Sequence, residues 1–565
     1  MFKSFQKPAH LYLGLTIIFS VISFYQLVRP GFFPMQDDLQ AFRVEQMVKC
    51  LKDFQIPCRW IPDMGYQYGY PQFNFYGPTP FYLGAAFNLI GIQVIDTVKI
   101  LFVLGFILSA VSMFIFLKSL LDEKAAFVGA VLYTYAPFKA AEVYVRGSLS
   151  EFLTFIFLPL LFWSSYQFFA FKKGKYLIWF ALVLAALLTT HNLTSLIFIP
   201  ILFVWILTLG FLNSNWKGFA KLILGFLLGG GISAFFVLPL LFEKSYVHLE
   251  TLTSGYFDYR QHFVSVYQMF ISNFFGYGSS VFGLNDGVSL STGQVHWAFA
   301  LLALVLSFVS YKKNKKLSIL VWTLSVLELF VLFMMHQKSS FIWEKLNFLT
   351  WLQFPWRFLV DSVFLLSVLS GISINLVSKI NKKLSLALGI LAIILVIILH
   401  GGFFQPREWL NISDAEKFSG ASWEKQLTIS IFDYLPIYAK FPPTHKAGAL
   451  PEVLQGEVSF MYYKKGSDYQ TSNIVVKKDA VLRLPLFDYP GMKVLVDGKT
   501  VDHNHDDCIN EEFCLGLISF KVPVGDHLIK AELTNTPVRT FGNLISVLSI
   551  VLIFVLLSKR DEKLS

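Results

Sequence analysis

Residues 97–117 read TVKILFVLGFILSAVSMFIFL, a stretch that carries a single charged side chain. A helix needs about 20 predominantly apolar residues to cross the hydrocarbon core of a bilayer, so this stretch predicts a membrane-spanning helix. The whole chain of 565 residues shares this character, because 55% of it is hydrophobic and only 15% is charged. Soluble domains carry about a quarter charged residues, and the composition therefore excludes an ordinary soluble protein.

Similar apolar runs recur along the chain and predict further spans. They are residues 11–28, 125–138, 151–171, 176–190, 193–212, 219–242, 295–311, 317–335, 358–378, 384–400 and 542–558. The formal net charge is +10, but Lys and Arg fall in short clusters between the runs. That pattern is typical of cytoplasmic loops and argues against a nucleic-acid-binding surface. With the N-terminus inside, every short basic cluster lies on one side. We therefore predict an α-helical polytopic membrane protein with about 12 transmembrane helices and both termini in the cytoplasm.

The loops between the runs predict the domain organisation. Residues 79–92 are apolar but short, and a span here would invert every later loop, so we expect an interfacial helix on the extracytoplasmic side. We predict a transmembrane domain at 1–400 with an extracytoplasmic loop at 29–96. An extracytoplasmic β-rich domain follows at 401–541, and a final span with a cytoplasmic tail occupies 542–565.

Within the third part, residues 450–537 alternate apolar and polar side chains, as in LRLPLFDYP and MKVLVDGKTV. This period of two is typical of strands, and Asp497-Gly498 is a turn signal. We predict a small antiparallel β-sandwich.

Four cysteines stand in two close pairs outside the apolar runs, Cys50 with Cys58 and Cys508 with Cys514. In an oxidising compartment each pair predicts a local disulfide, and the alternative is four free thiols. The segment 503–508, HNHDDC, contains metal-binding residue types without a familiar ligand spacing. We interpret it as a polar hairpin tip.

Two adjacent carboxylates, Asp37 and Asp38, follow the first run. At a membrane surface they are candidates for a catalytic base, or for hard oxygen ligands of a divalent cation such as Mg²⁺ or Mn²⁺. The alternative is a solvated cap before the amphipathic stretch 39–53. Further along the same loop, Tyr66 and Tyr70 belong to an aromatic run that suits a sugar face or an interfacial belt.

Charged residues also mark the next two outer edges. Arg146 suits a phosphate because its planar fork binds two oxygens, and Glu142 and Glu151 flank it. Glu142 and Arg146 are four residues apart, so a simple helix-surface ion pair is the alternative. His191 and Asn192 lie at the following edge, where they are expected to bind a ligand or to cap helix ends.

The loop before the run 358–378 contains Gln353, Trp356 and Arg357, with Asp361 one turn into the helix. Carboxylates inside a membrane are costly and mark functional sites by default, and Glu328 is a second one. Arg357 at i−4 is the obvious partner of Asp361, so a structural ion pair and a binding role stay open.

Several of these segments together resemble a known family. They are DDLQAFR (37–43), IPCRWIPDMGYQYGYPQFNFYGPTPFYLG (56–84), YVRGSLSEFL (144–153), THNLTSL (190–196) and QFPWRFL (353–359). They resemble the 6-pyruvoyl-tetrahydropterin synthase-related membrane domain and, more broadly, the GT-C superfamily of membrane glycosyltransferases. The C-terminal PLFDYPGMKVLVDGKTV (485–501) is similar to the tail of YfhO-like proteins.

The resemblance implies a GT-C-like fold and an inverting transfer from a polyprenyl-phosphate sugar donor. The acceptor would be a glycan, lipid or protein of the cell envelope, outside the cytoplasmic (plasma) membrane. Asp37 or Asp38 would act as base or hold a metal, and Arg146 and Arg357 would neutralise the donor phosphate. Relatives often carry a His four residues after this acid, where this chain has Ala41 and Phe42.

The expected substrate-binding residues are Glu142, Glu151, His191, Asn192, Tyr66, Tyr70, Gln353 and Trp356. We further predict that Asp38, Arg146 and His191 line one cavity open to the outside. A lipid-linked glycan transporter or assembly scaffold without transferase activity is the alternative function, followed by a structural membrane protein.

Overall fold

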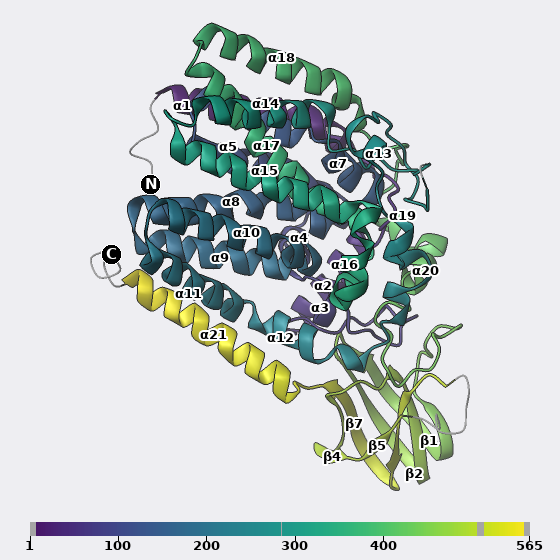
Figure 1. The fold of residues 1–565 in the computed structure, drawn as a ribbon. Coiled ribbons are helices and arrows are strands. Elements are labelled where there is room, and N and C mark those ends of the chain that lie inside the picture. Colours follow the sequence, from purple (N-terminus) through teal and green to yellow (C-terminus); the bar gives the residue numbers. More distant parts are fainter. Residues whose placement is uncertain (1–6, 284, 506–513, 559–565) are drawn as a thin grey trace.

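The computed structural model describes residues 7–283, 285–505 and 514–558. Long helices lie side by side in one elongated body, and a β-sheet projects from one end of it (Figure 1). The first long helix begins, and the last one ends, at the opposite end of the body (Figure 1).

Eight helical segments among the described residues are long and apolar enough to cross a membrane. These candidate spans lie at α1 (Lys7–Phe24), α5 (Val94–Lys118), α8 (Leu149–Phe171), α10 (Asn192–Leu212), α15 (Lys315–Met335), α17 (Leu359–Ser378), α18 (Lys382–His400) and α21 (Pro537–Ser558). The helices α9 (Gly174–Thr190) and α14 (Gln294–Ser310) are apolar but shorter.

Each predicted run contains helix, but the count of about 12 spans is not confirmed. The run 125–138 yields α6 (Glu123–Thr134), only 12 residues, because Pro137 opens a new turn. The run 219–242 divides into α11 (Trp216–Ile232) and α12 (Ala234–Phe242), which are bent by 78°. Three consecutive glycines precede this break, and glycine weakens a helix because it has no side chain to restrict its backbone.

The helix α17 lies at the centre of the helical bundle, where every residue except the last, Ser378, is buried. Two of its serines satisfy their hydroxyls within the helix, since Ser367 donates to the Val363 carbonyl and Ser370 to that of Leu366, both at 2.7 Å. Small residues let neighbouring backbones approach closely in membranes. A Cβ at Gly371 would lie 3.2 Å from the Ala125 carbonyl oxygen of α6.

The loop 29–96, which the predicted topology makes the first outer loop, folds over one end of this bundle with α2 (Gln40–Lys52), α3 (Gln72–Phe75) and α4 (Thr79–Leu89). The helix α4 falls in the segment 79–92 that was expected to be interfacial. Cys50 and Cys58 form the predicted disulfide within this loop. Cys508, one member of the second predicted pair, lies outside the described residues.

The remaining short helices connect these elements at the same end. They include α7 (Pro137–Ala140), the π-helical turn η2 (Ala141–Arg146), α13 (Val266–Phe270), α16 (Ser340–Lys345), the 3-10 turns η8 (Asn347–Leu352) and η9 (Pro355–Phe358), α19 (Asp414–Lys417) and α20 (Gly420–Thr428).

The C-terminal sheet contains seven antiparallel strands. They are β1 (Glu452–Lys465), β2 (Tyr469–Phe487), β3 (Met492–Val496), β4 (Lys499–Val501), β5 (His503–Asn504), β6 (Leu517–Val522) and β7 (Gly525–Leu533). The order is β4-β3-β7-β2-β6-β5, with β1 also paired to β2. The predicted sandwich implied two sheets, whereas one connected sheet forms because the long β2 pairs with β7 along one half and with β6 along the other.

The segment 401–451, predicted as part of the β-rich domain, carries short helices and lies against the first outer loop. Phe32 and Leu410 exchange backbone hydrogen bonds of 2.9 and 2.7 Å, and Lys417 forms an ion pair with Asp38. This packing brings residues far along the chain to the same end of the bundle as the first outer loop.

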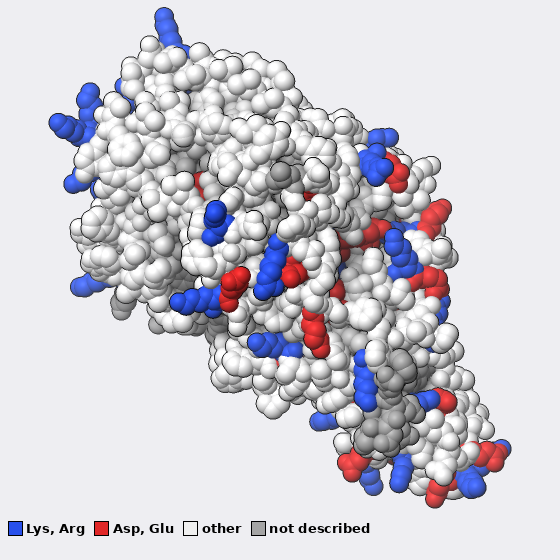
Figure 2. Space-filling model, turned by 45° about the vertical axis from the view of Figure 1, so that its right-hand side comes forward, with Lys and Arg blue, Asp and Glu red and all other residues white. Residues whose placement is uncertain are grey.

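Charge is distributed unevenly along the molecule. On the face in Figure 2, the bundle end away from the sheet shows Lys and Arg without acidic side chains, whereas both charges are mixed from the middle of the bundle to the sheet. A wide uncharged surface separates the ends (Figure 2). This asymmetry agrees with the positive-inside pattern, and the orientation stays a prediction.

Candidate active site

A cavity of about 670 Å³ opens among the first outer loop, η2, the junction of α9 and α10, η8, η9 and residues 430–434. Its polar lining residues include Gln36, Asp37, Arg43, Tyr76, Arg146, Ser148, His191, Asn192, Lys244, Gln353, Trp356, Arg357, Ser430, Asp433 and Tyr434. Its apolar lining residues include Leu193, Leu196, Leu240, Leu241, Leu249, Leu252, Phe257, Phe348 and Trp351. The cavity is therefore polar and charged on one side and apolar on the other.

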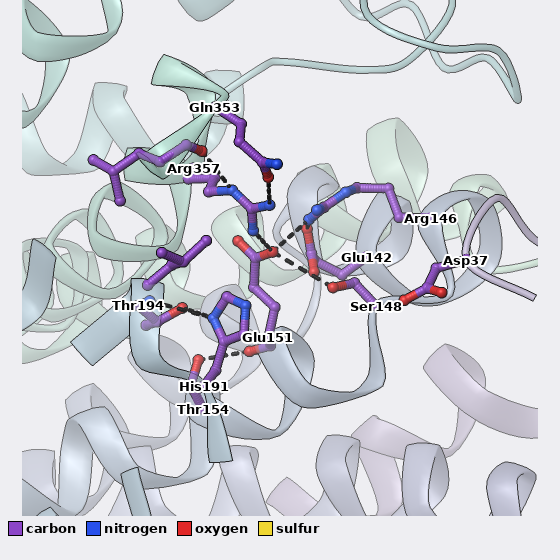
Figure 3. A network of polar contacts seen from close by, with 12 residues as sticks. Asp37, Glu142, Arg146, Ser148, Glu151, Thr154, His191, Thr194, Gln353 and Arg357 are labelled. Atoms are coloured by element: carbon purple, nitrogen blue, oxygen red, sulfur yellow. Dashed lines mark hydrogen bonds and ion pairs between the residues drawn. The ribbon is translucent and has the colours of Figure 1, made fainter. Parts of the chain in front are cut away.

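A buried ion network forms the charged side (Figure 3). One carboxylate oxygen of Glu151 accepts hydrogen bonds from Arg146 Nη1 at 2.9 Å and from Arg357 Nη1 at 2.7 Å. Arg146 Nη1 also donates to Glu142. The π-helical turn η2 ends at Gly147, whose φ of +64° suits glycine, and this sharp exit sets Arg146 beside the start of α8. The network thus joins two loops that are distant in sequence.

Arg357 is fixed from its other side by a strained turn. Its Nε donates to the Leu352 carbonyl at 2.9 Å, and its Nη2 donates to Gln353 Oε1 at 3.1 Å. Gln353 has φ +63° and ψ −44°, and the Phe354 N–H donates to the Leu352 carbonyl across it at 2.6 Å. This is a γ-turn of the rare, strained kind, and such strain clusters at functional sites.

Arg146 presents its guanidinium to the cavity. It lies against the Trp356 ring, 4.5 Å from the centroid. Glu142 beneath it is fully buried, and this burial raises the pKa of the Glu142 carboxyl. Arg146 and Arg357 line the cavity, whereas Glu142 and Glu151 lie behind them, so the network presents its positive groups to the cavity.

His191 both caps a helix and lines the cavity. Its Nδ1 accepts from the Thr194 N–H at 3.2 Å, so the ring closes the first turn of α10. Burial lowers the pKa of His191 to about 3, so the imidazole is neutral at physiological pH. Asn192 caps locally as well, since its Oδ1 accepts from the Leu193 N–H at 3.0 Å.

The two adjacent acids of the first loop point to different places. Asp37 lines the cavity, where its carboxylate accepts from Arg43 Nη1 at 2.9 and 3.1 Å and from Gln40 Nε2 at 2.8 Å. Asp38 turns away and binds Lys417 Nζ through both oxygens, at 2.7 and 2.8 Å. The prediction that Asp38 lines the cavity with Arg146 and His191 is therefore wrong for Asp38.

The geometry does not fit a divalent cation held by Asp37 and Asp38. A dication needs several free oxygen ligands, and here each carboxylate is paired to a different cationic side chain. Across the described parts of the chain, no three His, Cys, Asp or Glu residues are grouped as metal ligands. Arg43, Arg146 and Arg357 add positive charge to the cavity, which further opposes a dication.

Some predicted site residues lie outside the cavity lining. Glu142 and Glu151 lie beneath its wall as partners of Arg146. Tyr70 is fully buried, where its hydroxyl accepts from the Tyr434 N–H at 2.5 Å, so it positions residues 430–434. Tyr66 is half-buried, and its N–H donates to the Leu427 carbonyl at 3.1 Å.

The two acids inside the membrane domain do not join the site. Arg357 bonds Glu151, Gln353 and Leu352, so the expected pair with Asp361 is not formed. Glu328 instead accepts from Ser362 Oγ at 2.6 Å.

Sequence reasoning missed Arg43, Lys244, Ser430, Asp433 and Tyr434 as lining residues. Arg43 stands in the quoted segment DDLQAFR, where its side chain lies over the Tyr76 ring at 4.2 Å from the centroid. Asp433 lies in a stretch without periodicity, and burial raises its pKa to about 6. A titratable group with a shifted pKa in a cavity is a functional-site candidate.

The fold and cavity define a multi-pass membrane protein with a charged pocket at one end of its helices. The chain belongs to the family described as "6-pyruvoyl-tetrahydropterin synthase related domain; membrane protein", whose model matches residues 73–407, more than half of its length. This match confirms the family resemblance expected from the sequence.

Other comparisons show more distant similarity. An uncharacterized protein of Lactococcus lactis is 25% identical over 266 residues, which is 45% of this chain and 42% of that relative. An oligosaccharyltransferase of Archaeoglobus fulgidus tethered to an acceptor peptide is 13% identical with a TM-score of 0.45, covering 79% of this chain and 60% of that one. The arabinofuranosyltransferase AftD from mycobacteria is 12% identical with a TM-score of 0.45, covering 72% and 27%. The family membership rests on the model match.

Proposed function

We propose that this protein is a membrane glycosyltransferase that uses a polyprenyl-phosphate-linked sugar as donor and an extracytoplasmic envelope molecule as acceptor. One observation carries the proposal: a single cavity joins Arg146 and Arg357 to a wall of leucines and aromatic side chains. A lipid-linked phosphate has the matching chemistry, an anion attached to a long apolar chain. Arginine binds phosphate oxygens through a planar fork of donors.

The apolar side of the cavity suits the lipid. Leu240 and Leu241 come from α12, beyond the sharp bend after α11, and Leu193 and Leu196 come from the first turns of α10. Leu241 is more than half exposed, so this wall continues onto the outer surface of the helices. A polyprenyl chain lying there would leave its phosphate facing Arg146.

The reaction follows from this placement. An acceptor hydroxyl oxygen forms a bond to the anomeric carbon, and the bond between that carbon and the phosphate oxygen breaks with its electrons remaining on phosphate. The guanidinium of Arg146, backed by Trp356 and anchored by Glu151, stabilises the charge that develops on the leaving phosphate. The hydroxyl proton passes to a carboxylate, and the acids that line the cavity in the described chain are Asp37 and Asp433.

The orientation belongs to the same proposal. The chain would lie in the cytoplasmic membrane with both termini inside and the cavity and sheet outside. The transmembrane part at 1–400, the extracytoplasmic part at 401–541 and the final span and tail at 542–565 are the corresponding domains. His191, Asn192, Gln353 and Trp356 would contact the substrates from the cavity wall.

The test is transfer of labelled sugar from a panel of polyprenyl-phosphate sugars by purified protein. Asp37→Asn and Asp38→Asn form a matched pair, because the residues are adjacent but only Asp37 lines the cavity. We expect Asp37→Asn to lower transfer about 10- to 100-fold, the worth of a charged hydrogen bond. We expect Asp38→Asn to stay within about threefold, as for a partly exposed ion pair.

Equal losses in the two variants would contradict the assignment of Asp37 to the cavity. No transfer from any donor by folded wild-type protein would reject the transferase and favour a lipid-linked glycan transporter or an assembly scaffold.

A further inference from the structure

The two carboxylates of the cavity are held in different ways. Asp37 has its charge offset by Arg43, and its oxygens accept three side-chain hydrogen bonds from Arg43 and Gln40. Asp433 belongs to no ion pair recorded between described residues, and its side chain bonds only the hydroxyl of Ser430 among neighbouring side chains. The Asp37 oxygens are therefore already occupied by three hydrogen bonds, whereas Asp433 has more room to accept one from an acceptor hydroxyl.

The backbone around Asp433 is held in place. The Tyr70 hydroxyl accepts from the Tyr434 N–H and donates toward the carbonyls of Ser430 and Ile431 at 3.2 and 3.3 Å. The Tyr434 ring stacks on Phe75 with 5.5 Å between centroids. These contacts come from the first outer loop, so Asp433 is fixed against the same loop that carries Asp37.

Asp433 is also within reach of the cavity interior. It is half-buried and lines the cavity with its neighbours Ser430 and Tyr434. The arginines that would hold the donor phosphate, Arg146 and Arg357, line the same cavity but come from η2 and η9. A carboxylate without an ion pair among the described residues and a phosphate-binding pair thus share one cavity.

We propose that Asp433 is the general base that removes the proton from the acceptor hydroxyl. The inference rests on the proposed glycosyl transfer and identifies the residue that accepts the proton of the acceptor hydroxyl. As the acceptor oxygen bonds to the anomeric carbon, its proton moves to an Asp433 carboxylate oxygen, and the electrons of the broken bond stay on the donor phosphate. Asp37, with Arg43, then serves to position the acceptor.

The surroundings of Asp433 suit this task. Burial raises its pKa to about 6, while the Ser430 hydrogen bond and the charge of Arg43 act in the opposite direction. The charged and titratable groups facing it are Arg43, Asp37, Tyr70 and Tyr434. A base is most effective when its pKa lies near the working pH, where it is ionised yet still basic.

The experiment compares wild type with Asp433→Asn, Asp433→Glu and Ser430→Ala, using the donor found in the panel. A base contributes about 10²- to 10⁴-fold, so Asp433→Asn should lower kcat at least about 100-fold. Donor affinity, followed by the fluorescence of Trp351 and Trp356 in the cavity wall, should change less than about twofold. Asp433→Glu should recover part of the rate. Glu457→Gln, an exposed acid of the sheet paired with Lys477, is the control for charge removal.

The pH profile separates a base from a structural residue. Wild-type kcat should rise with pH to a plateau with a midpoint near 6, because only ionised Asp433 accepts a proton. The midpoint of this pH dependence should move to higher pH in Ser430→Ala, because the hydrogen bond that lowers the Asp433 pKa is lost. The residual activity of Asp433→Asn should show no such rise with pH. If wild type transfers sugar and Asp433→Asn is equally fast, or shows the same rise of kcat with pH, Asp433 is not the base. The proposed glycosyltransferase function would not be affected by that result. No transfer by wild type would overturn both.

Discussion

Two buried ion networks among the described residues differ in their access to the cavity. The first joins Glu142, Arg146, Glu151 and Arg357, and its arginine side chains keep 12% and 9% of their surface exposed toward the cavity. The second joins Arg539 at the start of α21 to Glu243 after α12, and both side chains are 0% exposed.

The second network is closed on every side. Arg539 Nε donates to Glu243 Oε2 at 2.9 Å, and Asn74 Nδ2 donates to the same oxygen at 2.9 Å. Thr536 Oγ1 donates to the other oxygen of Glu243. These contacts connect the first outer loop, α12 and the helix that follows the sheet. Buried charge alone therefore does not mark a site, whereas buried charge beside a cavity does.

The largest expected difference between the networks is in stability. Arg539→Leu should lower the free energy of unfolding by about 3–5 kcal/mol, because it leaves the Glu243 carboxylate buried without its partner. Arg146→Leu should cost less, because water in the cavity reaches the groups left behind. It should instead lower transfer about 10²- to 10³-fold through loss of phosphate stabilisation.

Denaturation in a mild detergent measures the first quantity, and transfer at equal folded concentration measures the second. The double variant Arg539→Leu with Glu243→Leu should recover part of the lost stability, since it removes the uncompensated charge. A greater loss of stability in Arg146→Leu than in Arg539→Leu would contradict the view that the network beside the cavity tolerates the loss of an arginine better than the fully buried one.

The sequence predicted the cavity network better than the closed one. Arg146, His191 and Arg357 each stand at an outer edge of an apolar run, so topology alone places them at one membrane level. Arg539 was assigned no role. Its partner Glu243 lies almost 300 residues earlier, and no periodicity links them.

The remaining site residues could not be predicted because the sequence does not show in which direction a side chain points. Asp37 and Asp38 are adjacent, so only the folded loop shows that one turns to Arg43 and the other to Lys417. Asp433 reaches the cavity because Tyr70 holds its segment, a contact across more than 360 residues. Hydropathy also could not show that the glycines before Ser233 break a run of sufficient length into two helices bent by 78°.

The cavity network should also respond to pH through His191. Its folded pKa of about 3 lies below the usual value of about 6.5, so below pH 6.5 the unfolded chain binds a proton that the folded protein does not. Stability from this group is therefore complete above that pH and is lost on acidification. Between pH 7.5 and 5 the loss amounts to about 2 kcal/mol.

His191→Asn tests this effect, because Asn also caps helices and does not titrate. Glu151, Arg146 and Arg357 face the ring and are retained in the variant. The difference in unfolding free energy between wild type and variant should narrow by that amount from pH 7.5 to 5. A constant difference would show that folding does not lower the pKa of His191.

The smallest expected effect concerns the turn that holds Arg357. Gln353→Ala and Gln353→Gly both lose the bonds from the side chain to Arg357 and to the Leu252 carbonyl. Only glycine accepts a φ of +63° without strain, so Gln353→Gly should be about 1–2 kcal/mol more stable than Gln353→Ala. Both variants should lose similar transfer activity, since Arg357 loses the same support in each. Unfolding and transfer of the two variants, measured side by side, separate backbone strain from side-chain contact. Equal stability would mean that the turn is relaxed, and that the Arg357 side of the cavity is held without backbone strain.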